Sequence, residues 1–442
     1  MRLFSTAALS LALAAASGMI VPGAAMAQKK DEAKGGAAQP AKLQASQGFF
    51  KIAKPLQDML GAKNFDGALG MMPQAEAAAT TPDDRYFVGN FWLNIGIGKQ
   101  DQATQLKGVE LMLDSGKVAP GDLAKIETAA GGLSLNLKNV PAARKHYTNA
   151  IAAGADPAET GALLAETYFG DAYSQIQGNG FTPAGRAAAI EGLPYLRKAI
   201  DAQLAKGSPP PLNWYERGFQ TAVVALAPDA FDWAKLTLAQ TDKAADWRIA
   251  LRLLQETYKD MPRPANIDLM RLMYDVKALQ GDYSYSEFID ALWKSGQPGE
   301  VKTIIDAGTT SGEIKKDRFA DFYKLASDAI PKDKAGLAAS EKAATAAPNG
   351  KPASRTADAY LGYGDNAKAI ELYKLALTKG GVDNDEVNTR LGIALWRSGD
   401  AAGAKAAFAA VSSTSPARKQ IADLWALWTG VKSKAAGAQA AL

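Results

Sequence analysis

Apolar residues recur every three to four positions from about residue 46 to residue 430, which is the pattern of amphipathic α-helices. Turn and cap signals interrupt the pattern at short intervals. Three of them pair an N-cap side chain with proline at the first helical position: Asp156–Pro157, Thr182–Pro183 and Ser415–Pro416. No run of alternating β-branched residues is bounded by hairpin turns. The sequence therefore predicts an all-α fold.

Two segments near the C-terminus repeat each other at a distance of 35 residues: GDNAKAIELYKLAL, which begins at Gly364, and GDAAGAKAAFAAVS, which begins at Gly399. A Gly-Asp pair is followed in each by an alanine, an aromatic residue and a small or apolar residue. The matched positions are Ala369 and Ala404, Tyr373 and Phe408, and Ala376 and Val411. Similarity at a fixed period indicates that the structural unit is a repeat that stacks on its neighbours.

This pair of segments resembles the tetratricopeptide repeat, a helix–turn–helix unit of about 34 residues. Leu391–Gly392 fits the first helix of the last unit, and Ala404, Phe408 and Pro416 fit its second helix and end. Weaker matches lie upstream at Phe65, Ala68, Met72 and Ala75, and at Gly131, Ala143, Tyr147 and Ala150. The resemblance implies a right-handed superhelix of helical hairpins, in which a small residue lets two helices approach and an aromatic ring fills the groove beside it.

The strength of the repeat pattern divides the chain into segments. Residues 46–208 read as degenerate repeats, and residues 209–348 as a middle section in which helical periodicity continues but the repeat is nearly unreadable. Residues 349–430 hold the C-terminal pair of repeats and a capping helix, whose Trp425 and Trp428 are expected to seal the end of the solenoid. Residues 431–442 read as a flexible tail.

The first 27 residues have the pattern of an export signal. Arg2 precedes an apolar stretch, and Ala25 and Ala27 supply small residues before a cleavage site that we place after Ala27. The alternative is a membrane anchor, but the strongly apolar part is shorter than the ~20 residues that a bilayer requires. Residues 28–45 are short, polar and rich in Lys, Ala and Gly, and read as a flexible linker. The sequence therefore predicts a soluble periplasmic protein with no integral membrane segment after cleavage.

Composition excludes several classes of site. The chain has no cysteine, so it can form neither disulfides nor thiolate metal sites. Removing Arg2 with the signal leaves 49 basic against 46 acidic residues, a net charge of +3 that is too small and scattered for a nucleic-acid footprint. The mature chain of 415 residues exceeds the roughly 250–300 residues that a single hydrophobic core supports. A solenoid is not subject to this limit, because each repeat packs only on its neighbours.

Candidate chemistry is sparse along the chain. His146 is the single histidine; it precedes Tyr147 and is expected to point away from the buried face of its helix. No second histidine can complete a zinc site, and no Gly-x-Ser-x-Gly elbow presents a nucleophile for a Ser-His-Asp triad. Gly178–Asn179–Gly180 and Gly362–Tyr363–Gly364 lack the remainder of a phosphate-loop motif. The acidic run that starts at Asp383 lacks the glycine and glutamate of a calcium loop. We expect no metal and no cofactor. A pair of converging carboxylates is the one catalytic arrangement that the sequence leaves open, because any two acids could meet in the fold.

The resemblance also implies where a partner would bind. In tetratricopeptide repeats the first helix of each hairpin lines a concave groove, which here would be formed by Lys351, Ser354, Asp358, Leu361, Glu386, Thr389, Ile393, Trp396 and Arg397. These side chains depart from the Lys and Asn pattern of the carboxylate-clamp members of the family. We therefore predict a non-catalytic scaffold that binds a helix or peptide of a protein partner. The alternative is a binder of cell-envelope glycan or of a small ligand that uses surface aromatics, and an enzyme comes third.

Overall fold

A computed structural model describes the backbone of residues 43–412 and 414–440, and side chains as far as residue 433. It confirms the all-α prediction: helices stacked as hairpins make up the described chain, and its two strands, Ile176–Gln177 (β1) and Gly180–Phe181 (β2), form one short antiparallel hairpin. The predicted export signal and its cleavage site lie outside the described residues. The same holds for nearly all of the predicted linker.

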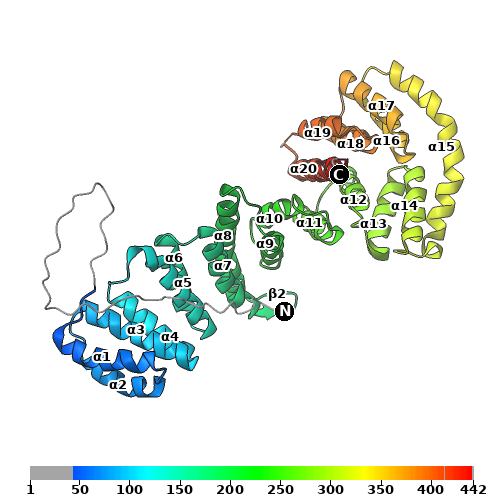
Figure 1. Cartoon of the computed structure of the whole chain (residues 1–442). Helices are drawn as coiled ribbons and strands as arrows, with labels where there is room; N and C mark the ends of the chain where they lie inside the picture. Colours follow the sequence, from blue (N-terminus) through cyan, green and yellow to red (C-terminus); the bar gives the residue numbers. More distant parts are fainter. Residues whose placement is uncertain (1–42, 413, 441–442) are drawn as a thin grey trace, which may run out of the picture. The chain divides into compact units, whose positions relative to one another are not determined.

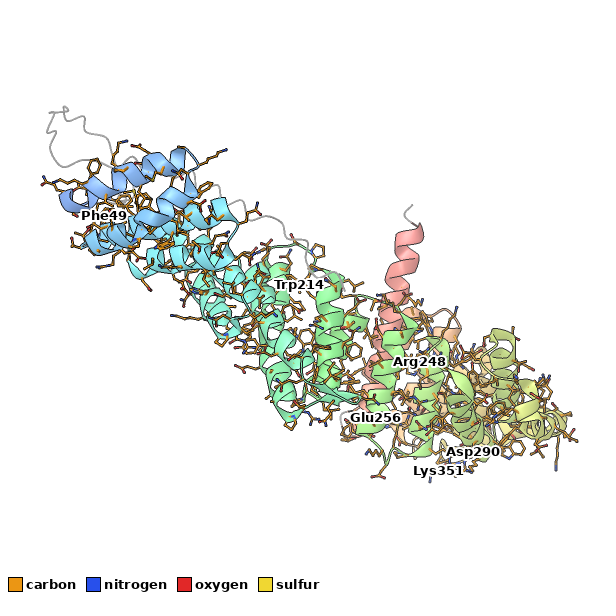
Figure 2. The ribbon with its side chains drawn as sticks, turned by 90° about the horizontal axis from the view of Figure 1, so that it is seen from below. Phe49, Trp214, Arg248, Glu256, Asp290 and Lys351 are labelled. Atoms are coloured by element: carbon orange, nitrogen blue, oxygen red, sulfur yellow. The ribbon has the colours of Figure 1, made fainter. Side chains whose placement is uncertain are left out.

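The chain forms two compact units, of which the first ends near residue 214. Its hairpins pair α1 with α2, α3 with α4, α5 with α6, and α7 with α8. Phe49 of α1 is fully buried among these first helices (Figure 2). The helices are α1 (Gln47–Gly61), α2 (Phe65–Ala78), α3 (Pro82–Lys99), α4 (Gln102–Asp114), α5 (Pro120–Asn136), α6 (Val140–Ala152), α7 (Pro157–Tyr173) and α8 (Pro183–Ala205).

Glycine on one helix and an aromatic ring on the next set the spacing within the hairpins. A Cβ on Gly131 of α5 would lie 2.6 Å from the ring of Tyr147 on α6. A Cβ on Gly392 would lie 2.4 Å from the ring of Phe408. Both contacts are too short for any side chain, so glycine is required for the helices to approach. The small-residue and aromatic positions predicted from the repeat therefore pack as expected.

The structure differs from the sequence prediction at two places in the first unit, the residues before α1 and His146 of α6. Ala45, at the end of the predicted linker, is only 2% exposed, and the amide of Gln44 donates to Asp83 at 2.8 Å. Residues 43–45, predicted to be part of the linker, therefore pack against the first helices. His146 was predicted on a polar face, and this is wrong: it is 6% exposed, with Nδ1 2.6 Å from Oε2 of buried Glu127. The histidine joins two helices inside the first unit.

The second unit comprises residues 215–223 and 227–442 and unites the predicted middle section with the C-terminal repeats. Helical periodicity in the unreadable middle section is confirmed. The helices are α9 (Leu212–Val224), α10 (Ala230–Leu238), α11 (Ala244–Thr257), α12 (Arg263–Asp275), α13 (Gly281–Lys294), α14 (Pro298–Ser311), α15 (Ala320–Ala346), α16 (Lys351–Gly362), α17 (Asn366–Lys379), α18 (Asn384–Arg397), α19 (Ala401–Ala409) and α20 (Pro416–Ala440), with a 3₁₀ turn at Lys316–Phe319.

The hairpins of the second unit form a closed arrangement, in which the last helices pack against α12. The first helices of successive hairpins are α12, α14, α16, α18 and the final helix α20, and α12 packs against both α18 and α20 (Figure 1). The concave side of the C-terminal repeats is therefore occupied by another helix of the same chain. This closure positions the sites described below.

The final helix closes the solenoid as the sequence predicted, but it is longer. Trp425 is fully buried, stacks on Phe408 with ring centroids 6.0 Å apart, and donates from Nε1 to the main-chain oxygen of Asp268 at 3.1 Å. Trp428 meets Trp247 edge to face at 5.5 Å. The backbone stays helical to Ala440, so residues predicted to be a flexible tail continue α20.

Helix α15 is the least covered long element of the second unit. Of its 27 residues only Ala326 and Ala344 are buried. Pro331 lies inside the helix, which is bowed (Figure 1). Proline removes one backbone hydrogen bond and is a common cause of such bending. The result is a long helical wall that the rest of the unit touches only in part.

Candidate functional site: a buried charge cluster and the cleft above it

A cluster of charged side chains joins the inner helices of the second unit. At its centre is Asp268 of α12, whose side chain is fully buried. Its carboxylate accepts from Arg271 at 2.8 Å, from Arg390 of α18 at 3.2 Å and from Arg418 of α20 at 2.8 Å. Burial alone would raise the pKa of Asp268, but the three guanidinium groups outweigh it and hold the pKa below its ordinary value. The carboxylate is therefore ionised at neutral pH.

Glu300 of α14 forms a second centre of the cluster. Arg271 donates to it from both Nε and Nη2, at 3.0 and 2.6 Å, and from Nη2 to Gln297 at 2.7 Å. Burial raises the pKa of Glu300, and Arg271 and Arg397 lower it by more, so the net shift is downward. Arg397 also pairs with Asp275, at the C-terminal end of α12, at 3.0 Å. These contacts fasten α12 to α14 and α18.

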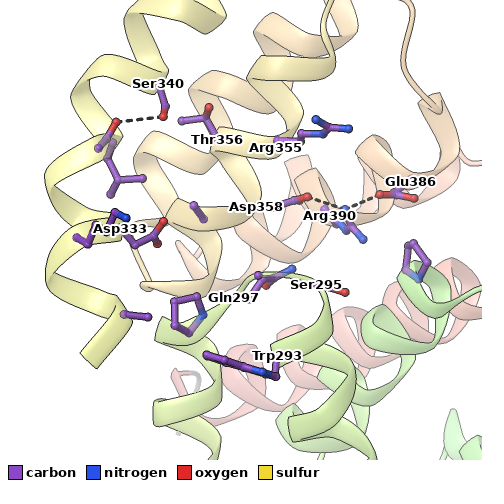
Figure 3. A pocket seen from close by; sticks show the side chains of 18 residues that line it. Trp293, Ser295, Gln297, Asp333, Ser340, Arg355, Thr356, Asp358, Glu386 and Arg390 are labelled. Atoms are coloured by element: carbon purple, nitrogen blue, oxygen red, sulfur yellow. Dashed lines mark hydrogen bonds and ion pairs between the residues drawn. The ribbon is translucent and has the colours of Figure 1, made fainter. Parts of the chain in front are cut away.

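The third part of the cluster faces solvent through a cleft. Arg390 donates to Asp358 of α16 at 2.9 Å and pairs with Glu386 at 2.5 Å (Figure 3). The hydroxyl of Tyr373 donates to Asp358 at 2.7 Å. Burial raises the pKa of Glu386, and repulsion from other carboxylates outweighs part of the attraction of its arginine partners. Such shifts occur at catalytic sites and in structural ion-pair networks alike.

The cleft, which we call the first cleft, has a volume of about 1000 Å³. One wall is the inner face of α15, whose residues at helical spacing are Ala329, Lys332, Asp333, Gly336, Leu337 and Ser340. The opposite side is formed by the N-terminal parts of α12, α14 and α18, the middle of α16, and Trp293 at the end of α13 (Figure 3). The remaining lining residues are Pro264, Ser295, Gly296, Gln297, Pro298, Arg355, Thr356, Asp358, Ala359, Glu386 and Arg390.

The first cleft is lined by equal numbers of acidic and basic side chains, and most of them have a hydrogen-bond or ion-pair partner within the protein. Arg390 is held by three carboxylates at its base, and Asp333 accepts from the hydroxyl of Tyr363 at 2.5 Å. Lys332 and Arg355 are exposed and have no acidic partner among the described residues. The base of the cleft thus presents paired groups, and the rim presents two cations that are free to bind. This arrangement is suited to holding a polar chain and offers no isolated acid–base pair.

The nine residues predicted to line a groove do not form one continuous surface. Leu361, Thr389 and Ile393 are buried, at 2%, 0% and 0% exposure. Helix α12 packs against α18, which carries Thr389 and Ile393, and α16, which carries Leu361, packs against α14, α15, α17 and α18. Asp358 and Glu386 line the first cleft, and Ser354 lies half-buried on the same helix as Asp358. Lys351 is exposed at the N-terminus of α16 (Figure 2). Arg397 belongs to the charge cluster, and Trp396 lies in a second cleft.

Sequence reasoning missed the charge cluster itself. The signal was present in the segment NIDLMRLMYD, where Asp268 and Arg271 stand three residues apart within an apolar run. Charged residues are almost never fully buried unless they are paired. An acid and a base on the buried face of one helix therefore indicate an internal ion-pair network. Their partners on α18 and α20 lie 122 and 150 residues away and could not be identified from spacing.

Comparison with known proteins supplies no family for this chain. No family model matches it, and no curated protein matches it. Among solved structures, Naa15/Naa10 bound to HypK-THB is 14% identical over 88% of this chain and 67% of that chain, with a TM-score of 0.27. The P58(IPK) TPR domain is 12% identical over 88% and 99%, with a TM-score of 0.22. The Cut9–Hcn1 structure of APC/C is 11% identical over 88% and 91%, with a TM-score of 0.20.

These likenesses are too low to support any statement about function, and the helical-hairpin architecture stands on the contacts described above. Within the described part of the chain, no helix combines the length and apolar character needed to cross a membrane. The same residues contain no group of three or more His, Cys, Asp or Glu side chains arranged to hold a metal ion.

Proposed function

We propose that this chain is an exported, non-catalytic scaffold that holds a segment of a protein partner in the first cleft. The observation that carries the proposal is the inner face of α15, which lines an open cleft of about 1000 Å³ and which the rest of the second unit contacts only in part. Surfaces formed by stacked helical hairpins commonly bind extended peptides or helices. The balanced charges of the cleft favour a polar partner segment over an apolar one.

The paired state of the cluster supports binding over catalysis. A general acid or base must exchange a proton with a substrate, whereas Glu386 is held by Arg390 at 2.5 Å and by Arg418 at 3.5 Å. Export is the part of the proposal that rests on sequence alone. It predicts that the mature protein begins at Gln28 and is recovered with the periplasmic fraction, which N-terminal sequencing of that fraction would test.

Site-specific photocrosslinking from α15 tests the cleft directly. A photoreactive amino acid at Ser340 would face the cleft. The same group at Ala338 would point about 200° away around the helix, onto solvent, and serves as the matched control. We expect a discrete protein adduct from position 340 in the intact cell envelope and none from position 338. Equal labelling from both positions, or an adduct from neither, contradicts the proposal.

A blocking substitution gives an independent test in the same helix. A Cβ added to Gly336 meets no atom within 4 Å, so Gly336→Trp places a large side chain in the cleft without disturbing the packed core. Ala338→Trp adds the same side chain on the opposite face. We expect the first variant to lose the crosslink from Ser340 and the second to keep it. Matching unfolding midpoints would show that both variants fold.

A further inference from the structure

A second cleft opens at the other end of the same inner helices and has a different character. The N-terminal ends of α12, α14 and α18 line the first cleft, and their C-terminal ends line the second. The second cleft has a volume of about 900 Å³, within the range of roughly 300–1,000 Å³ of small-molecule sites. Its volume lies apart from the α15 wall, and no residue lines both clefts.

Aromatic rings dominate the lining of the second cleft. Trp428 and Tyr285, at 5% and 4% exposure, contribute its base. Trp396 of α18 and Tyr274 of α12 are half-buried and keep part of their rings accessible. Aliphatic side chains contribute little, since only Leu279 and Ala307 take part. Two accessible rings above an aromatic base favour a ligand with a flat apolar face.

The charges around the rings are already neutralised. Asp275 is paired with Arg397 at 3.0 Å. Lys432 is paired with Asp242 at 2.8 Å, and its ammonium lies 4.4 Å from the centre of the Trp428 ring. Glu313 accepts from the amide of Gly281 at 3.1 Å. Glu313 and Lys277 add one unpaired charge of each sign to the lining, so the cleft has no net charge with which to select an ionic ligand.

The polar groups of the rim distinguish a sugar from a purely apolar ligand. Lys277 and Ser311 are exposed; Lys277 has no partner among the described residues, whereas the hydroxyl of Ser311 donates to the main-chain oxygen of Gly308 at 3.1 Å. An apolar side chain seated on the rings would cover the ammonium group of Lys277 and leave it without a hydrogen-bond partner, which is unfavourable. A pyranose ring has an apolar C–H face for stacking and a rim of hydroxyl groups that donate and accept hydrogen bonds.

We infer that the second cleft is a binding site for a neutral oligosaccharide, with Trp396 and Tyr274 as the stacking surface and Lys277 and Ser311 as hydrogen-bonding groups. β-Linked pyranoses with equatorial substituents fit best, because their faces are flat. The inference does not depend on the proposed function, since it concerns other residues and another ligand. It assigns Trp396 a sugar in place of the protein partner that the sequence predicted.

Titration with two neutral probes, cellotriose and triacetylchitotriose, tests the inference on the mature full-length protein. Calorimetry and tryptophan fluorescence follow binding together. We expect saturable binding of at least one probe with a Kd between about 10 μM and 1 mM. Trp396→Ala should weaken it at least about tenfold, and Trp396→Phe should retain part of the affinity because a ring remains. Tyr274→Ala provides a second variant, and urea unfolding of all three establishes that they fold.

Other outcomes overturn the inference. Absence of binding by the wild-type protein up to about 10 mM of either probe would exclude a sugar site of useful affinity. Equal affinities of wild type and a folded Trp396→Ala would place the sugar elsewhere. Binding of a phenylalanine-containing tripeptide in preference to both sugars would make the cleft a pocket for apolar side chains. Trp293→Ala, in the first cleft, is the matched control: it should leave sugar binding unchanged. Absence of a protein adduct from position 340 in the otherwise unaltered protein would count against the proposed function and leave the sugar site standing.

Discussion

Breaking the charge cluster should cost the second unit several kcal/mol of stability, and Asp268→Asn tests this with almost no change in volume. The amide replaces one accepting oxygen with a donor that faces guanidinium groups. Arg271 would keep Glu300, and Arg390 would keep Asp358 and Glu386, but Arg418 would keep only Glu386 at 3.5 Å. Arg418 is 4% exposed. Leaving a buried charge poorly paired costs about 3–5 kcal/mol, which is the loss we expect.

A double-mutant cycle isolates the interaction between Asp268 and Arg418 from the other contacts of each residue. Arg418→Met removes the cation that Asp268→Asn would strand, and Asp268 then still has Arg271 and Arg390. We expect Arg418→Met to cost about 1–3 kcal/mol, and the double variant to cost at least about 1 kcal/mol less than the sum of the two. Asp328→Asn, which breaks an exposed pair with Lys324, should change stability by no more than about 0.5 kcal/mol.

Urea unfolding, monitored by tryptophan fluorescence, gives the free energy of unfolding of each variant. The signal reports on the second unit, because Trp425 and five of the other seven tryptophans lie there. Costs that add within about 0.5 kcal/mol would refute coupling between Asp268 and Arg418. The pH dependence gives a second readout. The pKa values of Asp268 and Glu300 are lowered in the fold, so their contribution is present above about pH 4 and is lost as the pH falls through the folded pKa. Asp268→Asn should therefore flatten the acid limb of the stability curve.

Three further substitutions test the packing described above. Gly392→Ala would place a Cβ 2.4 Å from the ring of Phe408 and should lower the free energy of unfolding by about 1–3 kcal/mol in urea titrations. The same change at Gly336, where no atom lies within 4 Å, should raise it by up to about 1 kcal/mol because alanine is the better helix former. His146→Ala should destabilise the first unit by about 1–3 kcal/mol, since Glu127 loses a buried partner, and hydrogen exchange should show no change in the second unit.

Local features of the fold could be read from the sequence, and the contacts between distant repeats could not. Gly392 and Phe408 were identified because their spacing repeats and because each hairpin is built from residues close in sequence. The burial of Ile393 was missed for the opposite reason: it depends on where α12 lies after several hairpins, and small rotations between repeats add up along the chain. Periodicity indicates which face of a helix is apolar, but it does not reveal which helix will cover it.

The lone histidine illustrates the same limit at shorter range. His146 precedes Tyr147, so a single-face view of the helix places one inside and the other outside. In the structure both are buried, because α6 is contacted by α5 and by α7 on different sides. A helix in the interior of a stack has two covered faces, and a polar residue on the second face needs a partner such as Glu127. Sequence reasoning that allows only one buried face underestimates burial throughout a solenoid.

Closure of the second unit has a consequence for how binding can be organised. An open solenoid presents one concave groove, with the first helices side by side along it. Here α12 and its charge cluster fill that groove, so what remains accessible lies at the two ends of the inner helices. The N-terminal ends carry partial positive charge and border the first cleft, and the C-terminal ends carry partial negative charge and border the second. Two surfaces of different chemistry thus share α12, α14 and α18 while no residue lines both. Apolar packing could replace a cluster that gave only stability. These paired charges join α12 to α14, α18 and α20 between the two clefts, so we expect a variant that breaks them to alter binding at both.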